Sequence, residues 1–183
     1  TDPLELLPLL ALGRTREAQR RIKANPALAC QRGQLPQQPA GCWMEPLHFA
    51  SAYGNVAIVR GLLAAGADPW AGYRGHERRW ILPIHLAIGM GHLDITRLLL
   101  EAGAQPETGS QVCIAFSLAG YAQSQPIIDL LKSRDLDINA RRDDGEHCAH
   151  VHVRHPRLEP LKLLLDNQVE LDAQRKNGRT MLH

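Results

Sequence analysis

A five-residue phrase recurs along this chain, and its spacing constrains the fold more than any other feature. The phrase PLHFA at residues 46–50 returns as PIHLA at residues 83–87, so the two copies lie 37 residues apart. Gly54 and Gly91, which follow the two copies, keep the same interval. A chain that repeats one pattern at near-fixed intervals is predicted to stack similar structural repeats, and its function then lies on the surface of the stack.

Weaker copies of the phrase carry the register through the rest of the chain. Ser117 follows His85 by 32 residues, and His150 and His183 follow at further steps of 33. We expect all the repeats to form a single domain over residues 1–183. The predicted repeats span roughly residues 2–32, 43–75, 80–111, 112–143 and 144–176, with an incomplete one at 177–183.

Each repeat is predicted to hold two helices. Pro46 and Pro83 suit the first turn of a helix, where a proline loses no intrahelical hydrogen bond. A second segment follows with apolar residues at helical spacing, and Gly66 and Gly103 stand where a left-handed helix stop is expected. One such pair cannot bury its apolar stripe alone, so neighbouring pairs must stack. The second segments lie at 58–63, 95–100, 127–131 and 161–165, and residues 6–25 are interpreted as a divergent first repeat.

These phrases, together with the sequence GAD at residues 66–68, resemble the ankyrin repeat, a unit of about 33 residues with the signature T-P-L-H-x-A. The resemblance covers nearly the whole chain and is strongest in the repeats at 43–75 and 80–111. It implies an all-α solenoid of stacked helix-turn-helix units with β-turn or hairpin fingers. It also implies that the chain binds proteins through its fingers and the concave face of its first helices.

The early repeat intervals are longer than the later ones, which places extra residues in two fingers at 31–42 and 70–80. Insertions in such arrays map to loops on one face, often the binding face. The second finger holds two of the three Trp residues and one of the three Tyr in a chain that is only 4% aromatic. Trp, Tyr and Arg are enriched at binding hot spots. We therefore expect the fingers to contact a partner through Trp43, Trp70, Tyr73, Arg74, Arg78, Arg79 and Trp80.

For the Trp residues a structural alternative stays open, namely that the rings pin a long loop to the neighbouring repeat. Further contact candidates are the first-helix positions that alternate with the core. Tyr53 and Tyr121 among them are equally compatible with packing. These candidates are Ser51, Tyr53, Ile88, Met90 and Tyr121.

A group of imidazole and thiolate side chains raises the question of a zinc site. His150, however, occupies the repeated histidine position, where a bond to neighbouring backbone is expected, and His147 matches the helix-capping threonine of the signature. Pro156 closes the segment. We predict no metal site and no cofactor. The group comprises His147, Cys148, His150, His152 and His155.

Neither catalysis, nucleic-acid binding nor membrane insertion is predicted. Ser51 and Ser117 lack the strand-to-helix elbow of a nucleophile. The formal charge is only +2, and acidic fingers at 107–111 and 139–146 interrupt the positive strip that a phosphate backbone requires. No apolar run reaches the length of a membrane span. Four scattered cysteines suit a reducing compartment.

Two functions remain at this stage. The first is a monomeric, cytoplasmic interaction module without chemistry of its own, which binds another protein as a scaffold, adaptor or inhibitor. The alternative is the targeting or substrate-binding region of a larger multidomain protein, such as a bacterial effector delivered into a host cell, with its activity outside this chain. The unfinished repeat at 177–183 favours the alternative.

Overall fold

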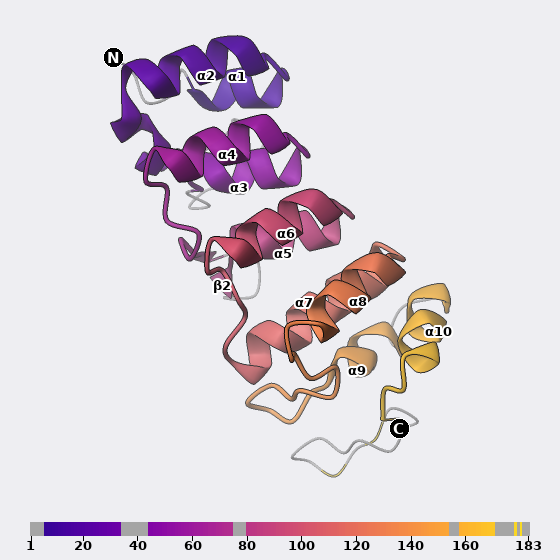
Figure 1. The fold of residues 1–183 in the computed structure, drawn as a ribbon. Helices are drawn as coiled ribbons and strands as arrows, with labels where there is room; N and C mark the ends of the chain where they lie inside the picture. Colours follow the sequence, from indigo (N-terminus) through magenta and orange to yellow (C-terminus); the bar gives the residue numbers. More distant parts are fainter. Residues whose placement is uncertain are drawn as a thin grey trace. The chain divides into compact units, whose positions relative to one another are not determined.

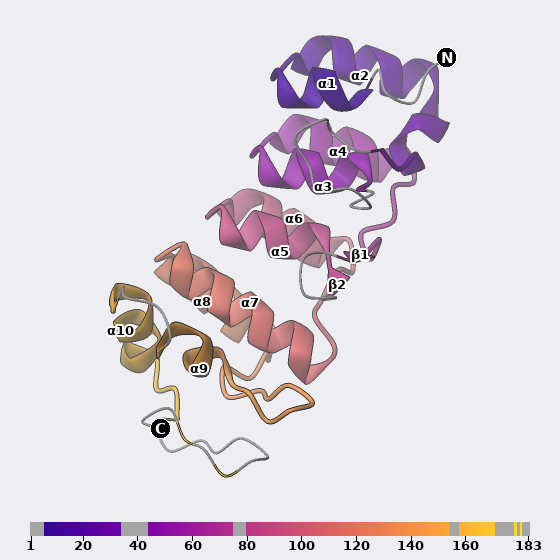
Figure 2. The same ribbon diagram turned by 180° about the vertical axis from the view of Figure 1, so that it is seen from behind.

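The computed structural model describes residues 6–33, 44–74, 80–153 and 158–170, together with Gly178 and Thr180; of Arg74 and Trp80 it describes the backbone alone. The chain divides into two compact units, which we call the N-terminal unit (1–104) and the C-terminal unit (105–183). Paired helices make up both units (Figures 1 and 2). The all-α repeat class predicted from the sequence is confirmed.

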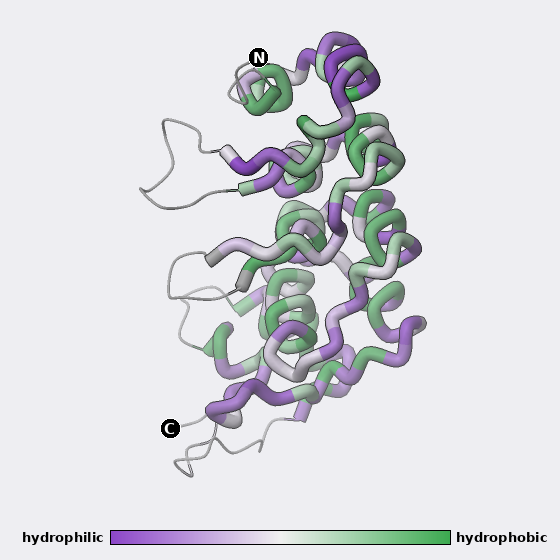
Figure 3. Tube along the Cα trace, turned by 90° about the vertical axis from the view of Figure 1, so that its left-hand side faces the viewer, coloured by the Kyte–Doolittle hydropathy of each residue, from purple (hydrophilic) through white to green (hydrophobic). Residues whose placement is uncertain are grey.

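The described residues of the N-terminal unit form three helix pairs. First helices α1, α3 and α5 pack on one another, and so do second helices α2, α4 and α6, so the unit has two layers (Figure 3). As predicted, α3 and α5 begin at Pro46 and Pro83. The elements are α1 (Leu6–Ala11), α2 (Thr15–Ala24), the 3-10 helix η2 (Pro26–Cys30), α3 (Pro46–Ala52), α4 (Val56–Ala64), α5 (Pro83–Gly89) and α6 (Leu93–Glu101).

Paired backbone marks the base of both long fingers. Strands β1 (Tyr73–Arg74) and β2 (Trp80–Ile81) form an antiparallel hairpin, in which Tyr73 lies opposite Ile81. An isolated antiparallel bridge joins Gly33 to Met44. The described base of each finger therefore lies immediately before a first helix, as the family resemblance implied.

Where the structure describes the C-terminal unit, it contains two helix pairs, in which α7 packs against α8, α9 and α10. The prediction of a finger at 107–111 was wrong, because α7 begins inside it at Gly109. The Thr108 hydroxyl accepts the Gln111 N–H at 3.2 Å, and this cap extends the helix towards its N-terminus. The helices are α7 (Gly109–Tyr121), α8 (Gln125–Lys132), α9 (Cys148–Val153) and α10 (Glu159–Asp166).

The core is aliphatic in both units. Leu47, Ile58 and Ile95 are completely enclosed in the N-terminal unit, and Phe116 and Ile127 are enclosed in the C-terminal unit. Gly66 and Gly103 end α4 and α6 with φ of +88° and +94°, which confirms the predicted left-handed stops. The helices are thus held by stacking of small and branched side chains, and their ends and fingers are left to present the surface.

Candidate binding surface

The histidine of the repeated phrase is a structural residue. His48 lies in the first turn of α3 and is 1% exposed. Its Nδ1 accepts the backbone N–H of Glu45 at 3.3 Å, so the proton of the ring is on Nε2, which donates to the carbonyl of Ile81 at 3.3 Å. His48 therefore ties the start of its own helix to the hairpin of the next repeat.

Burial keeps this ring neutral. Loss of solvent lowers the pKa of His48 to about 4, well below its usual 6.5, and hydrogen bonds to the Ile81 and Glu45 backbone offset only part of that effect. A neutral imidazole with one acceptor and one donor nitrogen is the form that both hydrogen bonds require.

The later histidines of the repeated phrase keep the same arrangement at the helix start. His85 accepts the N–H of Leu82 at 3.2 Å, and His150 accepts the N–H of His147 at 3.3 Å. In the remaining repeat, Ser117 donates to the carbonyl of Cys148 at 3.1 Å. The expectation that the repeated histidines bond to backbone is confirmed.

The structure accounts for part of the second finger. Tyr73 is half-buried, and its ring meets the His48 ring edge-on with centroids 5.2 Å apart. The backbone N–H of Trp70 donates to the Asp68 carboxylate at 2.9 Å, and its side chain is half-buried. Arg74 and Trp80 pair through their backbones. Trp43, Arg78 and Arg79 lie outside the described residues.

A ladder of exposed apolar side chains runs along the N-terminal unit. Leu12, Tyr53 and Met90 are 69%, 54% and 62% exposed. Each follows directly after a first helix, donates its backbone N–H to the carbonyl four residues earlier, and precedes a glycine of positive φ. We call these three residues the helix-end ladder. They hold the same position in three successive repeats, although only Tyr53 and Met90 were predicted.

Two of the predicted contact residues do not reach the surface. Ser51 and Ile88 have no exposed area, so their assignment to the contact face was wrong. Each lies two positions before a ladder residue, and positions two apart on a helix point to nearly opposite sides. The alternation that suggested Ser51 and Ile88 applies to strands and not to these helices.

The turn behind the ladder is sterically constrained. Gly54 has a φ of +76°, and a Cβ at this position would lie 2.7 Å from the His92 ring. That ring is held by a hydrogen bond between Nε2 and the carbonyl of Ala52 at 3.1 Å. Glycine at this position thus allows both the left-handed backbone conformation and the close approach of the next repeat. Together these two constraints fix the position of Tyr53.

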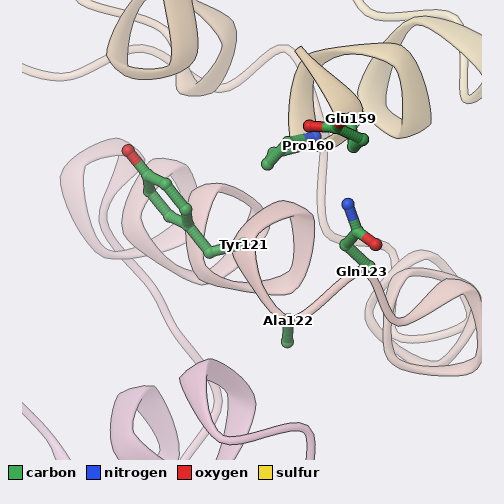
Figure 4. Close-up of a pocket in the computed structure, with 5 residues that line it drawn as sticks. All are labelled: Tyr121, Ala122, Gln123, Glu159 and Pro160. Atoms are coloured by element: carbon green, nitrogen blue, oxygen red, sulfur yellow. The ribbon is translucent and has the colours of Figure 1, made fainter. Parts of the chain in front are cut away.

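Tyr121, the predicted contact residue of the C-terminal unit, borders a hollow of about 450 Å³ (Figure 4). It is 38% exposed, and its ring lies against His152 with centroids 4.3 Å apart. Gln123 follows it after α7, and Glu159 and Pro160 line the hollow from the first turn of α10. Partial burial raises the pKa of the Tyr121 phenol. Tyr121 is therefore partly a packing residue and partly surface.

The described residues of the histidine and cysteine group before Pro156 form hydrogen bonds within the fold. His147 Nδ1 accepts the N–H of Ala149 at 3.3 Å, which confirms the predicted capping position, and its Nε2 bonds to Asn139 at 3.1 Å. Burial lowers the pKa of His147 to about 4. Burial also raises the pKa of the Cys148 thiol.

Among the residues that the structure describes, no three His, Cys, Asp or Glu side chains are placed to share a metal ion. His155, the last histidine of the group, lies outside those residues. The described histidines of the group make hydrogen bonds within the fold.

The family model of the ankyrin repeat matches residues 44–72 and 82–109. These segments are ankyrin repeats. They contain the α3–α4 and α5–α6 pairs, the two repeats in which the resemblance was strongest. A comparison with curated proteins finds no match to the chain. Ankyrin repeats are generally modules for protein–protein interaction.

Within the described residues, no helix is both long and apolar enough to cross a membrane. Leu12 is the contact candidate that sequence reasoning missed. Leu12 precedes Gly13 as Tyr53 precedes Gly54, 41 residues later, and this correspondence was the available signal. The insertion at 31–42 lengthens the interval between the repeats and so hides the correspondence.

Proposed function

We propose that the N-terminal unit binds a partner protein through the helix-end ladder, the β1–β2 hairpin and the first helices that connect them. In this role the chain is a scaffold, adaptor or inhibitor without chemistry of its own. The family to which the repeats belong supports the interaction role. The position and exposure of the ladder residues support the choice of this surface.

The observation that carries the proposal is the recurrence of exposure at one repeat position. A large apolar side chain more than half exposed is unremarkable when it occurs once, because much of any protein surface is apolar. Three of them at the same position of successive repeats form a line along one edge of the unit. Exposed apolar patches of this kind mark interaction sites, and Tyr and Met are enriched in interfaces.

The first helices join the ladder to the hairpin. In Figures 1 and 2 the turns after α1, α3 and α5 lie at one end of the unit, and the hairpin lies at the other. A seven-residue helix such as α3 rises about 10 Å, so a partner segment that follows the first helices reaches both ends. The tight packing of these helices limits the conformational entropy lost on association.

The aromatic and basic finger residues belong to this proposal as contacts at the hairpin end. Tyr73 rests on His48, which orients its ring without enclosing it. Tyr121 is proposed as a separate contact on the C-terminal unit, beside the hollow with Glu159. The hairpin-end contacts proposed are Trp43, Trp70, Tyr73, Arg74, Arg78, Arg79 and Trp80.

The test is an affinity purification from native cells with the full chain as bait. Tyr53→Ser with Met90→Ser removes two of the three apolar ladder side chains, and Arg74→Glu with Arg78→Glu and Arg79→Glu reverses the finger charge. Both variants are expected to lose the same bound protein. Arg97→Glu, an exposed substitution on α6, is the control and is expected to keep it. Equal recovery by wild type and both variants would reject the proposed surface.

A further inference from the structure

A second surface of the N-terminal unit has the form of a binding groove. It is a hollow of about 390 Å³ between α2 and α4, which pack side by side (Figures 1 and 2). Ile22 and Pro26 line it from one side, and Gly61, Ala64 and Ala65 line it from the other. No residue of the ladder or of the hairpin lines it. We call it the α2–α4 groove.

Gly61 leaves the groove open. The equivalent residue of the next repeat, 37 positions later, is Leu98, which is half-buried. A Cβ at Gly61 would meet no atom within 4 Å, so the fold does not require glycine there. Glycine inside a helix costs about 1 kcal/mol relative to alanine. Helix α4 therefore contains a destabilising residue, Gly61. Because glycine has no side chain, another chain has room to approach the helix there.

Positive charge is concentrated around this groove. Residues 14–65 contain seven arginine and lysine residues and two glutamates, a net charge of +5, whereas the whole chain carries +2. Both glutamates already bond to arginines of the same stretch. The pairs are Glu17 with Arg14 and Arg21, and Glu45 with Arg32.

The remaining four cations lie on α2 and α4, the two helices that form the groove. Arg16, Arg20 and Lys23 follow one another at helical spacing along an exposed side of α2, and Lys23 itself lines the groove. Arg60 lies one turn before Ala64 on the exposed side of α4. Within the described residues none of the four makes an ion pair. The lining of the groove is thus mostly apolar, and each of the two helices that form it carries exposed cations, which we call its basic rims.

We propose that the α2–α4 groove binds an acidic amphipathic segment of a partner protein. Apolar side chains of the segment fill the space over Gly61, and its carboxylates pair with the cations on both rims. The groove follows α2 for about two turns, which matches a helical segment of about 8–12 residues.

The shape favours a peptide over other anions. A nucleic-acid strand needs a continuous positive track, and here the centre is apolar. A membrane surface is flat, whereas these walls form a hollow between two helices. This site is independent of the function proposed above, because it uses different residues.

The test selects peptides from a randomised library displayed on phage, with the full folded chain as target and binding measured by fluorescence polarisation. We expect enriched peptides with acidic residues on one helical face and apolar residues on the other. Gly61→Leu, which installs the residue of the next repeat, and Lys23→Glu with Arg60→Glu should each weaken binding by about tenfold or more. Arg97→Glu, the repeat equivalent of Arg60, should change it less than about twofold.

Circular dichroism of each variant verifies that it folds. Failure to enrich any peptide, enrichment of peptides that are not acidic, or binding insensitive to Gly61→Leu would each overturn the proposal. So would Arg60-dependent binding to phosphatidylserine vesicles or to single-stranded RNA in place of peptides.

The ladder variant Tyr53→Ser with Met90→Ser separates this groove from the surface proposed above, and it should bind the selected peptides as the wild type does. Peptide binding that is lost in the ladder variant and kept in Gly61→Leu would assign the peptides to the ladder and overturn the groove proposal alone. Loss of the native partner by the ladder variant, with peptide binding intact, would support both.

Discussion

The two units build the same turns from different residues. In the N-terminal unit the turn after each first helix carries a glycine of positive φ, at Gly13, Gly54 and Gly91. In the C-terminal unit Gln123 takes this place with a φ of +50°, after a hydrogen bond from its N–H to the carbonyl of Gly120. Asp135, with a φ of +59°, likewise replaces the glycine stop after α8.

The difference shows that the backbone conformation persists where the residue that signals it has been lost. A side chain in the left-handed region costs roughly 1–2 kcal/mol, and stacking of the helix pair has to offset that cost. The family model matches residues 44–72 and 82–109, which lie almost wholly in the N-terminal unit, where proline, histidine and glycine are all present. In the C-terminal unit the helix-pair architecture therefore persists, although most of its sequence does not match the family model.

The largest predicted effect contrasts the two ways of holding a first helix. His48→Ala removes two hydrogen bonds and leaves the buried Glu45 N–H and the Ile81 carbonyl without these partners, so we expect unfolding to become easier by about 4 kcal/mol. Ser117→Ala removes a single bond and is expected to cost about 1 kcal/mol. Urea denaturation measures both. Equal losses of stability would mean that His48 contributes no more to holding its first helix than Ser117 does.

Gly54→Ala is expected to destabilise the protein by about 3 kcal/mol, because it adds a clash with the His92 ring to the cost of a left-handed alanine. Gly66→Ala is the matched control: its φ is also positive, but a Cβ there would meet nothing within 4 Å. That variant should lose only about 1 kcal/mol. Thermal unfolding of both proteins gives the comparison, and similar losses would refute the packing role of Gly54.

Acid should weaken both units through their neutral histidines. The folded pKa of His48 and of His147 is about 4, below the ordinary value of 6.5, so between these pH values the unfolded chain binds more protons than the folded one. Stability is then full above pH 6.5 and falls as pH drops towards 4, by up to about 1.4 kcal/mol per pH unit for each histidine. Denaturation measured across this pH range should show a shallower fall in stability for His48→Gln than for the wild type. An unchanged slope would contradict this role of His48.

The smallest effect has the opposite sign. Gln123→Gly and Asp135→Gly restore in the C-terminal unit the residue that the N-terminal unit uses, and each should stabilise the fold by up to about 1 kcal/mol. Gln111→Gly, within the first turn of α7, is a control that should destabilise it. Differential scanning calorimetry measures all three. Destabilisation by both turn variants would show that these side chains contribute more than their strain costs.

The sequence predicted most of what local chemistry determines. Pro46 and His48 mark a helix start in any context, and both lie where they were expected. The start of α7 could not be predicted from the repeat length, because the cap at Thr108 competes with the finger of the family pattern. Ser51 was misplaced because a strand period was applied to a helix.

The candidate surface was harder to predict than the fold. Tyr53 and Met90 were found, but burial decides which side of a short helix faces solvent, and that depends on the stacking of neighbouring repeats. Leu12 was missed because the inserted residues at 31–42 change the interval. The open space over Gly61 is a property of two packed helices and has no counterpart in a single sequence motif.

Site-specific photocrosslinking in native cells tests the central claim most directly. A photoreactive phenylalanine analogue is placed at Leu12, Tyr53 or Met90 in turn, with Arg97 as the exposed control position. The account predicts that all three ladder positions yield an adduct with the same protein and that position 97 yields none. Adducts of equal strength at position 97, or none from the ladder, would contradict it.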